Sequence, residues 1–293
     1  MSSSPPLPTF VIIGAQKSGT RWLRSNLGQH PEIFTAPAEV HFWNRAHRLA
    51  DPDGMAWYRE KFEGWSNEPI IGEATPGYMI YRHHPDAVAT RMKARLPDAR
   101  LIAILRNPID RANSAMLHHM RRKRLPPSAR LPQVARERRP TTMDRLCLVT
   151  GSWYAHSLEG YHREFGDNLL VLFYDDIERD PAGLYAAALR HVGASPGFTP
   201  PRLSARVFAN PLTTTKSKST AYTLSAAERR EMWQYFEEDV AKLEDMLGLD
   251  LSQWYPPASD DDDASGGDAV GRLSRWRARR KGGGAPHESA AGP

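Results

Sequence analysis

Apolar residues follow two alternating patterns along most of the chain. Mostly apolar stretches of five or six residues, typical of strands, occur at 9–13, 70–74, 100–105 and 169–174. Between and after these runs, apolar positions recur every three or four residues, which predicts helices from residue 20, over 85–96 and 108–122, across 143–165 and over 181–192. We therefore expect an α/β fold: a P-loop-like three-layer sandwich whose mainly parallel central sheet is flanked by helices.

The pattern weakens in the C-terminal third. Residues 193–222 contain several prolines and little periodicity, and a long loop of this kind is typical of a lid or binding segment. Ser225 and Glu228 form a capping-box sequence that predicts one further helix. The apolar stripe expected on that helix consists of Trp233, Phe236, Val240, Leu243 and Leu247. Residues 256–293 combine aspartates, glycines and a basic cluster with few apolar side chains. We therefore expect one domain over residues 1–255 and a disordered tail over 256–293.

Composition and charge narrow the possible partners. The apolar runs are too short for a membrane span or a signal-peptide core, so we expect a cytoplasmic protein without an integral membrane segment. The formal net charge of +5 is concentrated in an arginine-rich stretch at 121–139, which favours an anionic ligand but is also typical of a solvated surface. That stretch lacks interleaved aromatic residues and matches no nucleic-acid-binding motif, so we predict no nucleic-acid partner.

A glycine-rich loop follows the first predicted strand. Gly14 and Gly19 allow the backbone to turn and to approach a ligand closely, Lys17 adds a positive charge, and Ser18 and Thr20 add hydroxyl donors. Free backbone N–H groups and the helix dipole favour an anion at the start of a helix. The loop therefore predicts a phosphate-binding site, although an ordinary strand-to-helix turn would have the same position.

A second basic residue follows the third predicted strand. In nucleoside triphosphatases the loop lysine comes after the second glycine, and the partner strand supplies an aspartate that organises Mg²⁺. Here Lys17 precedes Gly19, and Arg106 takes the place of the aspartate. Asn107 and Pro108 then open a helix whose first two turns contain Ser114. These residues predict a nucleotide with two separate anionic groups, bound without a metal.

At these residues the sequence resembles the sulfotransferases that use 3′-phosphoadenosine 5′-phosphosulfate (PAPS), in particular the carbohydrate (heparan sulfate) branch and its bacterial counterparts. Residues 16–20 are similar to the 5′-phosphosulfate loop of that family, and residues 106–108 with Ser114 are similar to its 3′-phosphate site. The resemblance implies a donor site with these contacts: Lys17 at the bridging oxygen, Ser18, Gly19 and Thr20 at the 5′-phosphate, and Arg106 and Ser114 at the 3′-phosphate.

The acceptor oxygen also needs a group that takes its proton. Residues 38–43 resemble the Lys-Glu-x-His-Phe-Phe motif of the carbohydrate branch, which makes Glu39 the expected general base and His41 a supporting or alternate base. Residues 73–78 resemble the family's Glu-Lys-Ser-Pro-x-Tyr segment on the substrate cleft. The lysine of each motif is replaced by alanine, at Ala38 and Ala74.

Further donor contacts are expected at positions where the residues allow alternatives. Arg21 or Arg82 could replace the missing lysines, and the sequence does not choose between them. Lys216 and Lys218 resemble the basic segment that closes over the donor in this family, although a solvated loop has the same composition. Tyr154 is a further candidate nucleotide contact, although aromatic residues in apolar helices more often belong to the core.

These residues predict a sulfotransferase that moves a sulfuryl group from PAPS to a hydroxyl or amine of a carbohydrate, glycolipid or small-molecule acceptor, with Glu39 as base. Two alternatives remain open. A metal-dependent kinase could use the same loop, although the order of Lys17 and Gly19 and the presence of Arg106 disfavour it. A nucleotide- or polyanion-binding module without catalysis would make Glu39 dispensable. The sequence leaves the oligomeric state open.

Overall fold

The computed structural model describes residues 5–80, 84–138, 146–201, 203 and 222–256. The chain divides into two compact units, Met1–Thr223 and Leu224–Pro293. The predicted disordered tail and the predicted lysine contacts at 216 and 218 lie outside the described residues, and the extent of the domain, 1–255, stays a prediction. None of the described helices has the length and apolar character needed to cross a membrane.

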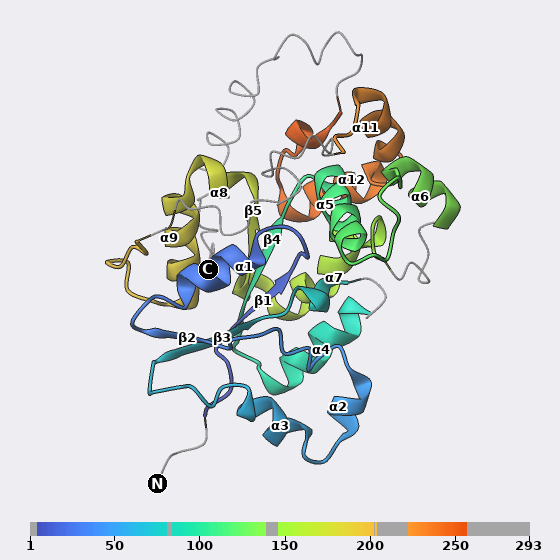
Figure 1. Ribbon diagram of the computed structural model, residues 1–293. Coiled ribbons are helices and arrows are strands. Elements are labelled where there is room, and N and C mark those ends of the chain that lie inside the picture. Colours follow the sequence, from blue (N-terminus) through green and yellow to red (C-terminus); the bar gives the residue numbers. More distant parts are fainter. Residues whose placement is uncertain (1–4, 81–83, 139–145, 202, 204–221, 257–293) are drawn as a thin grey trace, which may run out of the picture. The chain divides into compact units, whose positions relative to one another are not determined.

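The first unit is built on a parallel sheet of five strands in the order β2-β3-β1-β4-β5 (Figure 1). The strands are β1 (Phe10–Gly14), β2 (Ile33–Thr35), β3 (Ile70–Ala74), β4 (Arg100–Leu105) and β5 (Leu169–Phe173). Four of them lie where the apolar runs predict, with bounds that differ by at most one residue. The three-residue strand β2 at the sheet edge was not predicted, because so short a segment has no recognisable period.

Helices connect the strands of the first unit. They are α1 (Thr20–Leu27), α2 (Ala46–Ala50), α3 (Gly54–Glu60), α4 (Pro85–Arg95), α5 (Pro108–Arg121), α6 (Leu131–Arg138), α7 (Tyr154–Phe165), α8 (Asp175–Arg179) and α9 (Pro181–Val192). Short 3₁₀ turns lie at η1 (Pro76–Met79), η3 (Thr150–Ser152) and η4 (Gly166–Asn168). The side chain of Asn107 caps α5 by accepting hydrogen bonds from the backbone N–H groups of Ile109 and Asp110, at 3.0 and 3.3 Å.

The two faces of the sheet are covered by different helices, which confirms the predicted three-layer arrangement. Alternate residues of β1 and β4, such as Phe10 and Ile104, pack in one apolar cluster with residues of α1 and α9. Helix α7 contacts β4 and β5 and packs against α4 on the other side of the sheet (Figure 1). The strand order reverses beside β1, and in open parallel sheets a ligand crevice forms at the carboxyl ends of the strands at such a point.

Two helix predictions were wrong in their extent. Helices were expected across 143–165, but among the described residues of that range (146–165) the α-helix begins only at Tyr154, because the carbonyl groups of Cys147 and Leu148 accept hydrogen bonds from the buried Arg111 guanidinium instead of continuing a helix. In the second unit, the helix expected from Ser225 forms two helices, α11 (Ala226–Trp233) and α12 (Glu237–Leu247), followed by η5 (Ser252–Trp254). The predicted capping box of Ser225 and Glu228 is present.

The break between α11 and α12 occurs at a tighter turn. The backbone N–H of Phe236 donates to Trp233 O, three residues earlier, at 2.8 Å, and the Phe236 side chain is fully buried. Of the predicted apolar stripe, Phe236, Val240 and Leu243 are buried, whereas Trp233 and Leu247 are partly exposed.

Candidate functional site

The loop after β1 has the conformation that an anion site at a helix start needs. Lys17 and Gly19 both have positive φ angles, 73° and 94°, and Gly19 is the residue that precedes the first turn of α1. A Cβ atom at Gly19 would lie 2.3 Å from Cδ1 of Ile177, so a side chain there would require Ile177 to move and would also strain the backbone at its positive φ. The glycine therefore allows the loop to lie close to α8. The first N–H groups of α1 have no partner within the helix and are available to bind an anion.

Two hydroxyl residues of the loop are buried. Ser18 is fully buried, and Thr20 is 7% exposed. The Ser18 hydroxyl has no well-formed hydrogen bond among the described residues, although it lies close to the Tyr154 hydroxyl. A buried hydroxyl of this kind suits an oxygen-rich ligand, because an unmet hydrogen bond in a protein interior is energetically costly.

Arg106, at the carboxyl end of β4, lies against the same loop. Its Nη1 donates to the Lys17 carbonyl oxygen at 3.5 Å, and its Cζ lies 4.3 Å from the ring centroid of Tyr174, the residue after β5. The hydroxyl of Tyr154 donates to the Arg106 carbonyl oxygen at 2.9 Å. The structure thus brings Lys17, Arg106 and Tyr154 together. Tyr174 was missed because its pairing with Arg106 depends on the strand order.

Helix α5 carries a row of polar residues near Lys17. Arg111, Ser114, His118 and Arg121 follow one another at spacings of three or four residues, which places them on one face of the helix. The sequence shows this spacing, but only Ser114 was predicted as a ligand contact, and the structure places it partly buried on α5. Arg111 is fully buried, and Arg121 is exposed at the end of the helix.

Positive charge accumulates around Lys17. Burial lowers the pKa of Lys17 from 10.5 to about 8, and the charges of Arg121, Arg106 and Arg111 act in the same direction. Burial also lowers the pKa of His118 to about 4, with the charge of Lys17 as the next cause. Asp175 is a nearby carboxyl group, and burial raises its pKa although Arg179 and Arg106 act in the opposite direction. A site that depresses the pKa of its own lysine is suited to a ligand with several negative charges.

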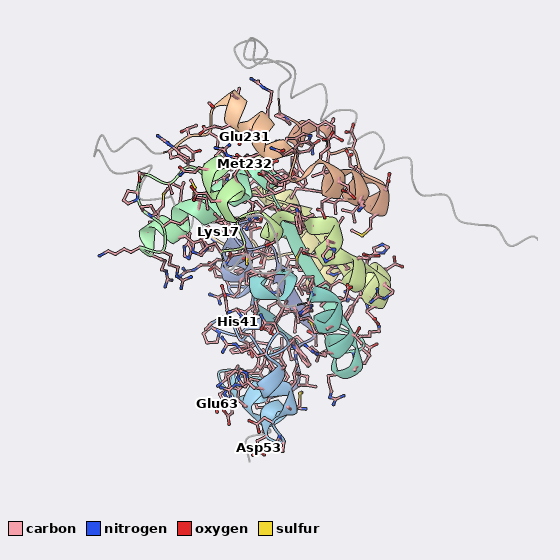
Figure 2. The ribbon with its side chains drawn as sticks, turned by 90° about the vertical axis from the view of Figure 1, so that its right-hand side faces the viewer. Lys17, His41, Asp53, Glu63, Glu231 and Met232 are labelled. Carbon is pink, nitrogen blue, oxygen red and sulfur yellow. The ribbon has the colours of Figure 1, made fainter. Side chains whose placement is uncertain are left out.

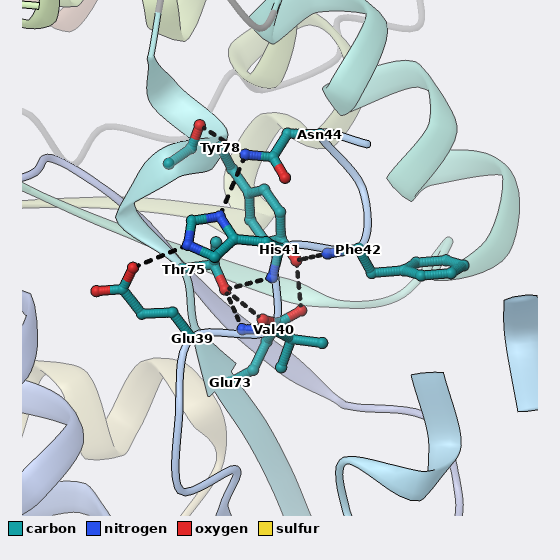
Figure 3. Close-up of polar contacts among 9 residues, drawn as sticks. Glu39, Val40, His41, Phe42, Asn44, Glu73, Thr75 and Tyr78 are labelled. Carbon is teal, nitrogen blue, oxygen red and sulfur yellow. Dashed lines mark hydrogen bonds and ion pairs between the residues drawn. The ribbon is translucent and has the colours of Figure 1, made fainter. Parts of the chain in front are cut away.

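The expected base lies in the loop that follows β2. Lys17 and His41 both belong to the first unit, and Figure 2 labels both side chains. Nε2 of His41 lies 3.1 Å from Oε2 of Glu39, whose side chain is 53% exposed, and Nδ1 of His41 lies 3.4 Å from Nδ2 of Asn44 (Figure 3). Glu39 and His41 therefore form a hydrogen-bonded pair that can reach an external substrate.

The loop with Glu39 and the loop with Lys17 leave the same edge of the sheet. The backbone N–H groups of Val40 and His41 donate to Oγ1 of Thr75, which directly follows β3, at 2.9 and 3.4 Å. Strand β3 is the immediate neighbour of β1, which ends in the Lys17 loop. Neighbouring strands lie about 4.8 Å apart, so the pair Glu39–His41 and the Lys17 loop are positioned by adjacent strand ends.

The positions that lack the family's lysines have different surroundings. Ala38 is exposed, and Ala74 is buried at the end of β3. Arg24 of α1 is partly buried; burial and the charge of Arg21 lower its pKa, whereas the charge of Glu39 raises it. Arg24 is thus a cation within electrostatic reach of Glu39. The alternative at Arg82 lies outside the described residues, and Arg21 is exposed on α1.

Among the residues that the structure describes, no three His, Cys, Asp or Glu side chains gather in a way that could hold a metal ion. The donor-side residues that the sequence predicts, Lys17, Ser18, Gly19, Thr20, Arg106 and Ser114, lie on the Lys17 loop, at the end of β4 and on α5. The arrangement can hold a polyanionic ligand by cations, hydroxyl groups and backbone N–H groups, with a carboxylate–imidazole pair at the neighbouring strand end.

Comparisons with known proteins agree with this chemistry. A family model described as "Sulfotransferase domain" matches residues 7–202. Human heparan sulfate glucosamine 3-O-sulfotransferase 3B1 is 31% identical over 191 residues, which are 62% of this chain and 45% of that protein. The human bifunctional heparan sulfate N-deacetylase/N-sulfotransferase 3 is 29% identical over 214 residues, 66% of this chain and 23% of that protein. The chain therefore spans less than half the length of these curated relatives.

A solved structure of similar size is also related. The crystal structure of a sulfotransferase from Alicyclobacillus acidocaldarius is 28% identical in sequence, with a TM-score of 0.68, and the match covers 85% of this chain and 99% of that one.

Proposed function

This chain belongs to the sulfotransferase domain family, and from that membership and the site we propose that it transfers a sulfuryl group from PAPS to a hydroxyl of a carbohydrate-like acceptor. The observation that carries the proposal is the convergence of Arg106 and the polar face of α5 on the Lys17 loop, where burial and like charges lower the lysine pKa to about 8. A donor with separate 5′ and 3′ anionic groups would compensate this charge without a metal.

The residues of the loop match the parts of such a donor. Backbone N–H groups at the start of α1, with the hydroxyls of Ser18 and Thr20, would hold the 5′-phosphate. Arg106 and Ser114 would hold the 3′-phosphate, and Arg106 is already oriented by its stacking on Tyr174. PAPS supplies an activated sulfuryl group, and these residues bind it and keep it oriented.

The chemistry requires one proton acceptor and one stabilising cation. As the acceptor oxygen forms a bond to sulfur, the bond from sulfur to the bridging oxygen breaks and its electron pair goes to the leaving 5′-phosphate. Lys17 would stabilise the negative charge that develops there. Glu39 would take the hydroxyl proton, and His41 would hold the Glu39 carboxylate through their 3.1 Å contact.

The acceptor class rests on the named relatives, whose names specify heparan sulfate and O- or N-sulfation. We propose transfer to a carbohydrate hydroxyl. A transfer screen that includes amino sugars distinguishes this acceptor from an amine. The cytoplasmic location and the roles of Lys216 and Lys218 stay predictions.

Isothermal titration calorimetry tests the donor site. We expect adenosine 3′,5′-bisphosphate to bind without magnesium, and we expect Lys17→Ala and Arg106→Ala each to weaken that binding. Preferential binding of ATP with Mg²⁺ would instead support a kinase.

A transfer screen tests the catalytic role. Labelled PAPS would be incubated with sugars, amino sugars, phenols and lipids, with Glu39→Gln as the comparison variant. We expect transfer to a sugar hydroxyl and a rate lower by at least about 100-fold in Glu39→Gln, because general-base catalysis contributes about 10²–10⁴-fold. Binding of the bisphosphate with no transfer to any acceptor would favour a non-catalytic nucleotide-binding module.

A further inference from the structure

A buried carboxylate lies behind the segment 40–43, which contains His41 and directly follows Glu39. Glu73, the fourth residue of β3, is fully buried. Three hydroxyl groups donate hydrogen bonds to it: Tyr58 Oη and Tyr78 Oη to Oε1 at 2.7 and 3.0 Å, and Thr75 Oγ1 to Oε2 at 2.7 Å. Burial raises the pKa of Glu73, and these three hydrogen bonds oppose that shift.

The same three hydroxyl oxygens accept hydrogen bonds from the segment 40–43, and Figure 3 shows the bonds to Thr75 and Tyr78. The donors are the backbone N–H groups of Val40 and His41 to Thr75 Oγ1 at 2.9 and 3.4 Å, that of Phe42 to Tyr78 Oη at 3.2 Å, and the indole N–H of Trp43 to Tyr58 Oη at 3.2 Å. Four consecutive residues are thus connected to one carboxylate, each through a single hydroxyl group.

The direction of these hydrogen bonds depends on the carboxylate. An N–H group can only donate, so a hydroxyl that accepts from it must direct its own single proton elsewhere. An ionised carboxylate carries no proton and can accept from all three hydroxyls at once. A glutamine amide in its place would direct its NH₂ group at one of those hydroxyls. That hydroxyl would then face only donors, and its own proton would have no acceptor.

The backbone at His41 needs this support. His41 has a φ angle of 54°, in the left-handed region that a residue with a side chain adopts only when its surroundings enforce it. The N–H groups of Val40 and His41, which precede the Cα atom of His41, both bond to Thr75, and the N–H group of Phe42, which follows it, bonds to Tyr78. The left-handed conformation in turn orients the imidazole that contacts Glu39.

We infer that Glu73 is a positioning residue for sulfuryl transfer, which acts through Thr75, Tyr78 and Tyr58 to hold the Glu39–His41 pair in its working orientation. This inference rests on the proposed function, because it assigns to Glu73 the geometry of the proposed base. Glu73 is fully buried, so it cannot contact an external donor or acceptor. It acts indirectly, by setting the direction of the three hydrogen bonds that it accepts.

The test uses Thr75→Val, which keeps the shape of the side chain but removes the hydroxyl, together with Glu73→Gln and the conservative variant Thr75→Ser. Each variant would be prepared as the whole chain and assayed for transfer of labelled sulfate from PAPS to water and, separately, to a heparan sulfate oligosaccharide. We expect kcat to fall by about 10- to 100-fold in Thr75→Val and Glu73→Gln, since a small misplacement of a catalytic group has effects of this size. We expect Thr75→Ser to stay within about threefold of the original chain, because its hydroxyl can restore the hydrogen bonds.

Two further measurements separate positioning from general damage. The dissociation constant of adenosine 3′,5′-bisphosphate should change by less than about twofold in all variants, because none of the altered residues belongs to the donor site. Hydrogen–deuterium exchange of the amides at 40 and 41 should become faster in Thr75→Val and remain slow in Thr75→Ser. This exchange reports on the network even if the chain transfers no sulfate, so failure of the inference and failure of the proposed function are distinguishable.

Thr9→Val is the matched control. The Thr9 hydroxyl also bonds to β3, at Ile71 O and Ile71 N with distances of 3.1 and 3.2 Å, but it lies at the opposite end of the strand from Glu73. We expect Thr9→Val to leave kcat unchanged. The inference is overturned if Thr75→Val keeps the original kcat and exchange rates, if Thr75→Ser is as impaired as Thr75→Val, or if bisphosphate binding is lost in parallel with transfer.

Discussion

Replacing Lys17 with methionine should stabilise the free protein and abolish its function. The pKa of Lys17 falls from 10.5 to about 8, a difference of about 2.5 units, because the ammonium group is buried beside Arg121, Arg106 and Arg111. At about 1.36 kcal/mol per unit, this corresponds to a ceiling of roughly 3.4 kcal/mol of stability lost by holding the charge there. Lys17 keeps partial contact with solvent, so screening reduces our expectation to about 1.5 kcal/mol.

The size of this effect depends on pH. The folded-state pKa of Lys17 lies below its unfolded-state value, so the destabilisation is fully present below about pH 8 and is relieved as pH rises toward 10.5. A methionine of similar length has no charge to desolvate. The gain from Lys17→Met should therefore be greatest near neutral pH and smallest above about pH 10.

Thermal unfolding at pH 7 and pH 10 measures this difference. For a unit of this size a gain of about 1.5 kcal/mol corresponds to a rise of roughly 3–6 °C in Tm, and we expect it at pH 7 in the absence of ligand. Adding adenosine 3′,5′-bisphosphate should raise the Tm of the original chain much more than that of the variant. Lys93→Met is the control. Lys93 belongs to α4, and its Nζ donates a solvent-exposed hydrogen bond to Pro97 O at 2.8 Å. A lower or unchanged Tm for Lys17→Met at pH 7, with ligand binding intact, would refute the reasoning.

Three further changes test other parts of the site. Arg106→Ala should weaken adenosine 3′,5′-bisphosphate by more than about tenfold but adenosine 5′-monophosphate only slightly, since the arginine is assigned to the 3′-phosphate; calorimetry with both nucleotides measures the ratio. Gly19→Ala should destabilise the protein by about 1–3 kcal/mol and reduce donor binding, because φ is 94° and the new Cβ would lie 2.3 Å from Ile177 Cδ1; urea unfolding and calorimetry measure both effects. Asn107→Ala should cost about 1 kcal/mol in urea unfolding through loss of the α5 cap. Finally, bisphosphate affinity of the original chain should stay constant below about pH 8 and fall by up to tenfold per unit above it, because Lys17 loses its proton there; a flat profile across pH 7–10 would contradict this assignment.

Local patterns predicted much of the fold and several of the residues that the structure brings together around Lys17. The strands β3 and β4 and the helix α9 have the bounds that the apolar runs and periodicity predict, because buried strands and amphipathic helices leave short-range signals. The Lys17 loop and the Asn107 cap were also recognisable, since each depends on a few consecutive residues. The edge strand β2 and the late start of α7 were not predictable, because one is too short and the other depends on a buried arginine from α5.

The sequence by itself determined which chemical groups are present: a lysine and hydroxyls after one strand, an arginine after another, and a glutamate and histidine two residues apart. The tertiary structure decided which of them meet. Arg106 reaches both Lys17 and Tyr174 because β4 lies between β1 and β5, and the segment after Glu39 is held by Glu73 because β3 lies between β2 and β1. Strand order and burial arise from packing among residues distant in the chain, and burial is also the principal cause of the lowered pKa of Lys17.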